Sequence, residues 1–217
     1  MDKEILNQQS QHWEKNFSNK SEMFGLEPSI AAIKALNTFK KQKITRIIEL
    51  GSGLGRDTIF FAQNLINVVA LDYSSSANKN VNLKAKKNNL SNYISTKIFD
   101  IRKKLPFEDN SIEACFSHML YCMALTKSDL NRLNNEIYRV LKPNGLNIYT
   151  VRHTNDGDYK KGIHRGEDLY ENDGFIVHFF SLDKINSLLE GFENLSIENF
   201  EEGSFPRKLF LVQNRKK

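Results

Sequence analysis

Short apolar runs alternate with amphipathic stretches along the chain, and this alternation is the first indication of its structure. The runs at 45–51 and 67–72 are apolar and rich in β-branched residues, which is typical of strands buried on both faces of a sheet. Within 127–145, apolar residues recur at the spacing of a helix that buries one side, and Pro143 and Gly145 end that pattern. The same criteria predict strands at 45–51, 67–72, 95–100, 111–118, 145–152, 195–203 and 206–214, and helices at 56–65, 75–89, 127–145 and 181–192.

The alternation of strands and helices predicts an α/β fold, a doubly wound and mostly parallel sheet with helices on both faces. The last two apolar runs are joined by a short turn, so we expect them to pair antiparallel. Ligands of such sheets bind beyond the carboxyl ends of the strands, where the strand order reverses. We therefore expect Glu49–Gly55, Asp72, Asp100 and Ser117–Tyr121 to converge on one crevice.

The segment 153–180 shows neither pattern and is predicted to be a long loop. It follows the strand at 145–152, so it would hang over the mouth of the crevice, and long loops without structure of their own are usually functional. No internal repeat, proline-rich linker or low-complexity stretch divides the chain. Its 217 residues therefore suit a single domain, 1–217.

The composition narrows the classes of function. With 40% hydrophobic and 26% charged residues the chain has the composition of a soluble globular protein, and no apolar stretch is long enough to span a bilayer. The net charge is +5, but the basic clusters at 40–43, 84–87, 102–104 and 215–217 are dispersed, which favours a solvated surface over a nucleic-acid interface. The N-terminus lacks a secretory signal, so we expect a cytoplasmic protein.

The stretch IIELGSGLGRD, residues 47–57, ends an apolar strand with an acid and three alternating glycines. Glycine permits positive φ angles and lets the main chain approach a ligand closely. A dinucleotide site would need its third glycine one residue later, and Glu49 would repel a pyrophosphate. Asp72 ends the next strand, where a carboxylate can bind a ribose diol. These residues favour S-adenosylmethionine, which has a ribose, a cationic amino acid part and no phosphate, over NAD(P) and an oxidoreductase.

From its glycine loop nearly to its C-terminus, the chain resembles the class I S-adenosylmethionine-dependent methyltransferases of the small-molecule type. The matching stretches are IELGSGLGRD (48–57), VVALDYS (68–74), KIFDI (97–101), LPFEDNSIEACFS (105–117) and EIYRVLKPNGLNIYTV (136–151). The resemblance implies a Rossmann-like sheet of about seven strands with an antiparallel last strand. We accordingly divide the chain into an N-terminal helical lid region (1–44), a cofactor-binding core (45–152), a substrate-lid loop (153–180) and a C-terminal helix and hairpin (181–217).

The resemblance also implies where S-adenosylmethionine binds. The main chain of residues 51–53 would contact its methionine part, and Asp72 would accept hydrogen bonds from both ribose hydroxyls. Asp100 would accept from the adenine amino group, while Ser117 and His118 would border the sulfonium. The cofactor-binding residues implied in this way are Glu49, Gly51, Ser52, Gly53, Asp72, Tyr73, Ser74, Asp100, Ile101 and Ser117.

No single catalytic group stands out. Because the sulfonium methyl group is already activated, alignment of the acceptor can supply most of the acceleration, and only an oxygen or ammonium acceptor must lose a proton. The candidate groups are His118, Tyr121, His153, His164 and His178. We expect no metal, because neither the histidines and acids of 153–180 nor Cys115 and Cys122 match a known metal spacing.

Trp13 and Phe17 precede FGLEPS (24–29), and this region resembles the N-terminal lid of small-molecule methyltransferases related to thiopurine and tellurite-resistance enzymes. An aromatic face near the sulfonium would add cation–π attraction. Packing of a helix on the sheet edge would explain the same pair equally well. Asp57, just inside the helix after the glycine loop, is expected to cap or ion-pair locally.

Other acceptors remain open at this point. Methylation of the adenine amine uses a proline-containing turn after the fourth strand, and SHMLYCM (117–123) contains no proline. Neither cysteine follows a proline, as cytosine methylation at carbon 5 would require. A tRNA needs neither motif, so RNA and protein acceptors stay as alternatives, together with a protein that binds the cofactor without catalysis. The sequence specifies neither the acceptor nor the oligomeric state.

Overall fold

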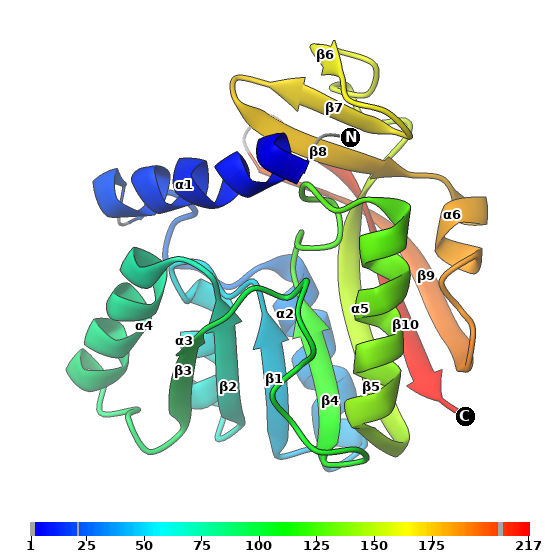
Figure 1. Ribbon diagram of the computed structural model, residues 1–217. Coiled ribbons are helices and arrows are strands. Elements are labelled where there is room, and N and C mark those ends of the chain that lie inside the picture. Colours follow the sequence, from blue (N-terminus) through cyan, green and yellow to red (C-terminus); the bar gives the residue numbers. More distant parts are fainter. Residues whose placement is uncertain (1–2, 21, 204–205) are drawn as a thin grey trace.

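The computed structural model describes residues 3–20, 22–203 and 206–217 (Figure 1). Its helices are α1 (Lys3–Asn19), α2 (Ile30–Lys41), α3 (Arg56–Gln63), α4 (Ser75–Lys87), α5 (Lys127–Val140) and α6 (Leu182–Asn186). Its strands are β1 (Arg46–Leu50), β2 (Asn67–Asp72), β3 (Ile94–Ile98), β4 (Ile112–Ser117), β5 (Leu141–His153), β6 (Ile163–His164), β7 (Leu169–Asn172), β8 (Phe175–Phe180), β9 (Phe192–Glu202) and β10 (Arg207–Lys216).

The strands form one sheet in the order β3-β2-β1-β4-β5-β8-β7-β6, with β10 between β5 and β9. Strands β1 to β5 pair in parallel, whereas β10 runs antiparallel to both of its neighbours. The predicted α/β fold, with a mostly parallel sheet and an antiparallel last strand, is therefore confirmed. The strand order reverses between β1 and β4, so a crevice for a ligand is expected beyond their carboxyl ends.

The two faces of the sheet bury alternate residues of the same strands. Ile47 of β1 packs with Phe39 of α2 and Phe61 of α3 on one face. Its neighbour Ile48 packs on the other face, in the cluster that includes Ile137 of α5. All five side chains are fully buried, and each contributes about 1.5–3 kcal/mol to stability. Helix packing on both faces thus holds the strand ends in fixed positions.

Residues 153–180 differ from the prediction, because this segment carries three strands. Strands β7 and β8 pair antiparallel around Asp173 and Gly174, whose φ angles of 50° and 80° form a tight hairpin turn. Strand β8 then joins β5 in parallel, beyond the last β4 pair and on the edge of β5 opposite β10. The prediction of a loop without structure is wrong, and we call residues 153–180 the strand insert.

Two predicted helices are shorter in the structure. Helix α5 ends at Val140 and not at 145, because Leu141 already pairs with Ile112 of β4. Helix α6 covers only Leu182–Asn186 of the predicted 181–192, and β9 begins at Phe192. These changes move element boundaries without changing the order of the elements.

Helix α1 crosses above the carboxyl ends of the strands, from the strand insert to α4 (Figure 1). At its N-terminal end Ile5 packs with Ile176 of β8. At its C-terminal end Phe17 packs with Leu54 of the glycine loop and Ala77 of α4. The helix therefore forms a roof over the place where the sheet predicts a ligand.

Candidate active site

The glycine loop, residues 51–55, turns from β1 into α3 and lies against the end of β2. The amides of Gly51 and Ser52 donate to the Leu71 carbonyl oxygen at 2.8 and 3.2 Å. Gly55 has a φ of 80°, and a Cβ at this position would lie 2.6 Å from Val81 of α4. Neither the backbone angle nor the space admits a side chain at Gly55. The loop is thus fixed to its neighbours through its main chain.

Asp72 ends β2 and points at the glycine loop, as the sequence predicts. Its Oδ2 accepts from the Gly53 amide and its Oδ1 from the Ser74 amide, both at 2.9 Å. Burial raises the pKa of Asp72 to about 6, with the charge of Glu14 acting in the same direction and the two amides opposing it. Each carboxylate oxygen keeps a further lone pair, so Asp72 can accept two more hydrogen bonds from a ligand.

Glu49 lies at the carboxyl end of β1, but its carboxylate is turned into the protein. Only 3% of the residue is exposed, and Thr58 of α3 donates a hydrogen bond of 2.5 Å to Oε2. Burial, followed by the nearby charge of Asp57, raises the pKa of Glu49 well above its ordinary value. Glu49 therefore joins the end of β1 to α3, on the two sides of the glycine loop, through its hydrogen bond with Thr58.

Asp57 forms the local ion pair that the sequence allows, with Oδ1 3.7 Å from Nε of Arg56, but its hydrogen bonds reach α2 and do not cap α3. Its carboxylate accepts from the Ser29 amide at 2.7 Å and from the Ser29 hydroxyl at 2.8 Å. Ser29 is the N-cap of α2, so this contact fastens the start of α2 to the start of α3. The pair is buried and lies next to the glycine loop.

Asp100 and its neighbours lie after β3 and would form the adenine end of the site. The Asp100 carboxylate accepts from Nη2 of Arg102 at 2.8 Å and from Nε at 3.0 Å. Burial of Asp100 opposes ionisation, but these hydrogen bonds and the charge of Arg102 lower the pKa of its carboxyl below the ordinary value. Ile101 is buried. An adenine amino group would therefore share Asp100 with Arg102.

Ser74 joins the ribose end of the predicted site to the roof. Its hydroxyl caps α4 by accepting from the Ala77 amide at 3.0 Å, and it donates to Glu14 of α1 at 2.5 Å. Glu14 also accepts from the Ser76 hydroxyl at 2.5 Å. A carboxylate at the start of a helix is favoured by the helix dipole. This contact could not be predicted from local sequence patterns, because α1 and α4 meet only in the folded chain. Tyr73 is half-buried beside Asp72, and burial raises its pKa.

Ser117 and His118 end β4 beside the glycine loop, as predicted. Ser117 is fully buried, and within the described part of the chain its hydroxyl has no hydrogen-bond partner. The Thr150 hydroxyl accepts from the Met119 amide at 2.8 Å and lies within hydrogen-bond distance of Nδ1 of His118, at 3.1 Å. Nε2 of His118 then donates to Glu202 at 2.9 Å. Both ring nitrogens of His118 are engaged, which leaves neither of them available as a base in this conformation.

Glu202 stands at the end of β9 and was not among the residues singled out from the sequence. Its carboxylate accepts hydrogen bonds from His118 and from the Ile30 amide, the latter at 3.2 Å, and forms an ion pair with Arg56 at 3.6 Å. Burial alone would raise its pKa, but His118 and Arg56 lower the pKa of Glu202 to about 2. The C-terminal hairpin therefore contacts the starts of α2 and α3 and the residue after β4 through one charged side chain.

Tyr121 is a correction to the candidate catalytic groups. Its ring is fully buried and stacks on Tyr149, with centroids 4.2 Å apart. Its hydroxyl accepts from the Asn147 side chain at 3.1 Å, and burial raises its pKa well above the ordinary value. Position after β4 suggested Tyr121, but packing against β5 turns it away from the crevice and into the core.

His153 and His164 belong to the strand insert and its entry. His153 stacks on Phe210, with centroids 4.1 Å apart, and its Nδ1 accepts from the Asn155 amide at 2.7 Å. Partial burial and then the charge of Lys208 lower its pKa. His164 is exposed, and its Nε2 lies 3.0 Å from a main-chain carbonyl oxygen. Both rings are held by main-chain contacts.

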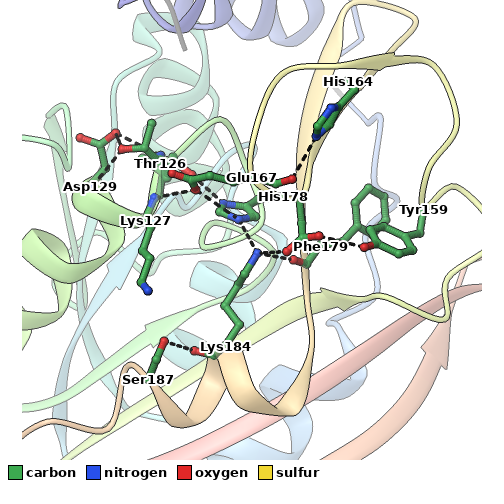
Figure 2. Close-up of polar contacts among 12 residues, drawn as sticks. Thr126, Lys127, Asp129, Tyr159, His164, Glu167, His178, Phe179, Lys184 and Ser187 are labelled. Carbon is green, nitrogen blue, oxygen red and sulfur yellow. Dashed lines mark hydrogen bonds and ion pairs between the residues drawn. The ribbon is translucent and has the colours of Figure 1, made fainter.

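A polar network fastens the strand insert to α6 and to the segment after β4 (Figure 2). The Lys184 ammonium lies 2.8 Å from Nε2 of His178 and 3.1 Å from the Phe179 carbonyl oxygen, and it pairs with Asp168. Nδ1 of His178 donates to the Leu125 carbonyl oxygen at 2.7 Å, so Nε2 accepts from Lys184. Burial, with the charge of Lys184, lowers the pKa of His178 to about 4. His178 is therefore a neutral internal link.

Helix α1 is attached at both ends of the crevice. On the side of the strand insert, Gln9 donates to the Gly174 carbonyl oxygen at 2.9 Å and accepts from the Ile176 amide at 3.2 Å. On the side of α4, Glu14 binds the serines described above. Phe17 lies over Gly53, 3.5 Å from the position of a Cβ there. Polar contacts thus attach α1 on both sides of the crevice, and near its C-terminal end the Phe17 ring covers the glycine loop.

Residues 3–20, 22–203 and 206–217 contain no group of three or more His, Cys, Asp or Glu side chains that could hold a metal ion. No helix there combines the length and the apolar character that crossing a membrane would need. Cys115 and Cys122 are free thiols in the core.

Comparison with known proteins identifies the domain. Residues 48–149 match the family model described as a methyltransferase domain. Over 103 residues the chain is 34% identical to phosphoethanolamine N-methyltransferase 1 of Triticum aestivum, a match that covers 46% of this chain. It covers 20% of that relative, so the chain spans about a fifth of its length.

Solved structures share the fold over most of the chain. The 1,6-didemethyltoxoflavin-N1-methyltransferase of Burkholderia thailandensis, with bound S-adenosylhomocysteine, has a TM-score of 0.76 at 13% identity and covers 100% of this chain and 91% of its own. A methyltransferase of Methanosarcina mazei has a TM-score of 0.70 at 19% identity and covers 81% of this chain and 93% of its own. At these identities the likeness concerns the fold.

The fold, the glycine loop and the acid at the end of β2 are those of an α/β protein whose ligand would lie at the carboxyl ends of the strands. Residues 48–149 form a methyltransferase domain. The resemblance to the class I S-adenosylmethionine-dependent methyltransferases seen in the sequence is thereby confirmed over these residues, and the match supports S-adenosylmethionine rather than NAD(P) as the cofactor.

Proposed function

We propose that this chain transfers a methyl group from S-adenosylmethionine to a small molecule bound beneath α1, between the glycine loop and the strand insert. S-Adenosylmethionine supplies a methyl group on a positively charged sulfur. The protein then has to hold the acceptor in line with that group and exclude water. The observation that carries the proposal is the roof formed by α1, which is attached to both sides of the crevice.

The residues at the strand ends fit the cofactor. Asp72 has a free lone pair on each oxygen for the ribose hydroxyls, and its place beside Gly53 brings the sugar next to the glycine loop. The buried hydroxyl of Ser117, which lacks a partner among the described residues, is the kind of group that a ligand completes. Phe17 and Leu120 cover Gly53 and Gly51, so both would line the methionine part.

The inner side of the roof favours a small acceptor over a polymer. Besides the polar Gln9, α1 packs apolar and aromatic side chains against the sheet and the strand insert, with Ile5 and Phe17 at its two ends. Trp13 lies between them, 4.8 Å from Phe175 of β8. A bound nucleic acid would require cationic side chains along an open path, and Lys15 of α1 is exposed on its outer side.

A transfer experiment tests the proposal. Purified protein and S-adenosyl-[methyl-³H]methionine are incubated with cell extract that has been separated into small molecules, RNA and protein. We expect tritium in the small-molecule fraction. Because two of the relatives named above are N-methyltransferases, phosphoethanolamine and other amines are the first pure compounds to assay. Label in RNA or protein would refute the proposal, and binding of S-adenosylhomocysteine without any transfer would support the non-catalytic alternative.

A further inference from the structure

We propose that His12 of α1 is a catalytic residue, whose Nε2 binds the methyl acceptor and takes its proton. This inference rests on the proposed function and extends it, because it names the group that acts on the acceptor. It requires a nitrogen or oxygen acceptor that bears a proton, since a thiolate would need no base. His12 was not among the candidate groups chosen from the sequence.

The hydrogen bonds of the histidines single out His12. His118 and His178 each have both ring nitrogens engaged. His153 and His164 each have one nitrogen bonded to the main chain, outside the roof. Within the described part of the chain, Nε2 of His12 is the one histidine nitrogen that is buried without a hydrogen-bond partner.

The ring of His12 is held in a slot of the strand insert. A Cβ on Gly174 would lie 2.8 Å from Cε1 and 3.5 Å from Nε2 of His12, so glycine at this position leaves the space that the imidazole fills. The Phe175 ring meets the imidazole edge-on, with centroids 4.3 Å apart and planes at 85°. Contacts on these sides fix the ring before any acceptor binds.

A buried ring nitrogen without a hydrogen-bond partner destabilises the fold, which is why such atoms are rare in folded proteins. The other buried polar side chain of α1, Gln9, has both its groups satisfied by β8. One turn along α1, His12 occupies the same side of the helix with its nitrogen unpaired. A methyl acceptor bound under the roof could donate a hydrogen bond from its N–H or O–H group to this nitrogen.

The charged groups nearest the ring along α1 and in the facing turn are Glu14, Lys15 and Asp173. On α1 the adjacent acid is Glu14, which the serines of α4 hold. Lys15 is exposed, and Asp173 is the acid in the facing turn. No ion pair to the imidazole of His12 occurs among the described side chains, so the ring is not committed to a structural charge.

The proposed step conserves atoms and charge. The electron pair of the acceptor forms the bond to the methyl carbon, and the electron pair of the carbon–sulfur bond stays on sulfur. The acceptor proton passes to Nε2 of His12. The positive charge thus moves from the sulfur to the imidazole. Neither the methylated acceptor nor the sulfur of S-adenosylhomocysteine carries that charge afterwards.

The test compares His12→Phe and His12→Gln with the unmodified protein in the tritium-transfer assay. Phenylalanine keeps the ring and its contacts, and glutamine can hydrogen-bond but cannot take the proton. We expect transfer to be at least about a hundredfold slower in both variants. We also expect the affinity for S-adenosylhomocysteine to stay unchanged, and the melting temperature of His12→Phe, which loses the unpaired nitrogen, not to fall.

Lys15→Ala is the matched control, because Lys15 is exposed on the same helix, and it should transfer at the unmodified rate. Full activity of His12→Phe, with small molecules labelled, would overturn the role of His12 and leave the proposed function standing. If RNA or protein is labelled instead, the proposed function fails, and the same variants still decide whether His12 acts on that acceptor. If no fraction is labelled although S-adenosylhomocysteine binds, both proposals fall.

Discussion

The titration of Asp72 offers a direct test of the ribose site. Burial raises the pKa of this carboxyl to about 6, so between pH 7 and pH 5 it changes from mainly ionised to mainly protonated. A protonated carboxyl loses the charge that strengthens its hydrogen bonds to ribose hydroxyls. If only the ionised form binds well, the affinity for S-adenosylhomocysteine should fall by about tenfold from pH 7 to pH 5.

The same group changes the stability of the protein. Its pKa is higher in the folded protein than in the unfolded chain, so its contribution to stability is fully present below about pH 4 and is lost as the pH rises through 6. The loss amounts to about 3 kcal/mol at neutral pH, since each pKa unit corresponds to about 1.4 kcal/mol. A bound ribose offsets this cost. S-Adenosylhomocysteine should therefore raise the melting temperature more at about pH 7.5 than at about pH 5.

Calorimetric titration at several pH values, with Asp72→Asn and Glu49→Gln as comparisons, separates this effect from others. Asp72→Asn should bind at least about tenfold more weakly at neutral pH and show a flat profile. Glu49 is also buried with a raised pKa, but its carboxylate bonds to Thr58, so Glu49→Gln should keep the slope. A flat profile in the unmodified protein, or an unchanged slope in Asp72→Asn, would refute the ribose assignment.

Three further variants test contacts around the site. Glu14→Gln weakens the attachment of the roof to α4, so S-adenosylhomocysteine should leave about five to ten times faster, as followed by the fluorescence of the chain's single tryptophan. Lys184→Met leaves Nε2 of His178 without its donor, and hydrogen exchange should show the strand insert destabilised by about 2 kcal/mol. Because the pKa of His178 is lowered to about 4, the insert should also lose about 2 kcal/mol between pH 7 and pH 5, where the unfolded imidazole takes up a proton and the folded one does not. Asp57→Ala removes two buried hydrogen bonds to Ser29 and should lower the free energy of unfolding by about 3 kcal/mol.

Each of these has an outcome that contradicts it. An unchanged dissociation rate in Glu14→Gln would mean that the roof opens without breaking this contact. Equal exchange of the β7 and β8 amides in Lys184→Met and the unmodified protein would show that the network in Figure 2 adds no stability. For Asp57→Ala, a chemical denaturation midpoint equal to that of the unmodified protein would rule out the buried pair as a source of stability.

The cofactor half of the site could be predicted from the sequence because its determinants are local. The strand pattern around Ile47 and Ile48, followed by glycines, fixes where β1 ends and where the loop turns. The acid ending β2 follows from the next apolar run, and the reversal of strand order then brings the two together. The 2.9 Å contact between Gly53 and Asp72 is a consequence of that topology.

The acceptor half could not be predicted in the same way. The strand insert does carry a local sign, since Asn172, Asp173 and Gly174 form a typical hairpin turn, but the flanking runs are short and partly polar. The contact of Glu14 with Ser74 joins residues 60 positions apart and depends on how α1 packs. The unpaired nitrogen of His12 becomes visible only when every other partner in its slot is known.

The position of β10 has a consequence for how the protein is made. β10 pairs with both β5 and β9, and among the described residues it is the strand that connects β9 to the sheet. On a translating ribosome, a chain that has emerged only as far as β9 therefore shows β5 with one bare edge, and bare strand edges favour aggregation. The nascent polypeptide stays vulnerable until residues 207–216 are available to fill that gap.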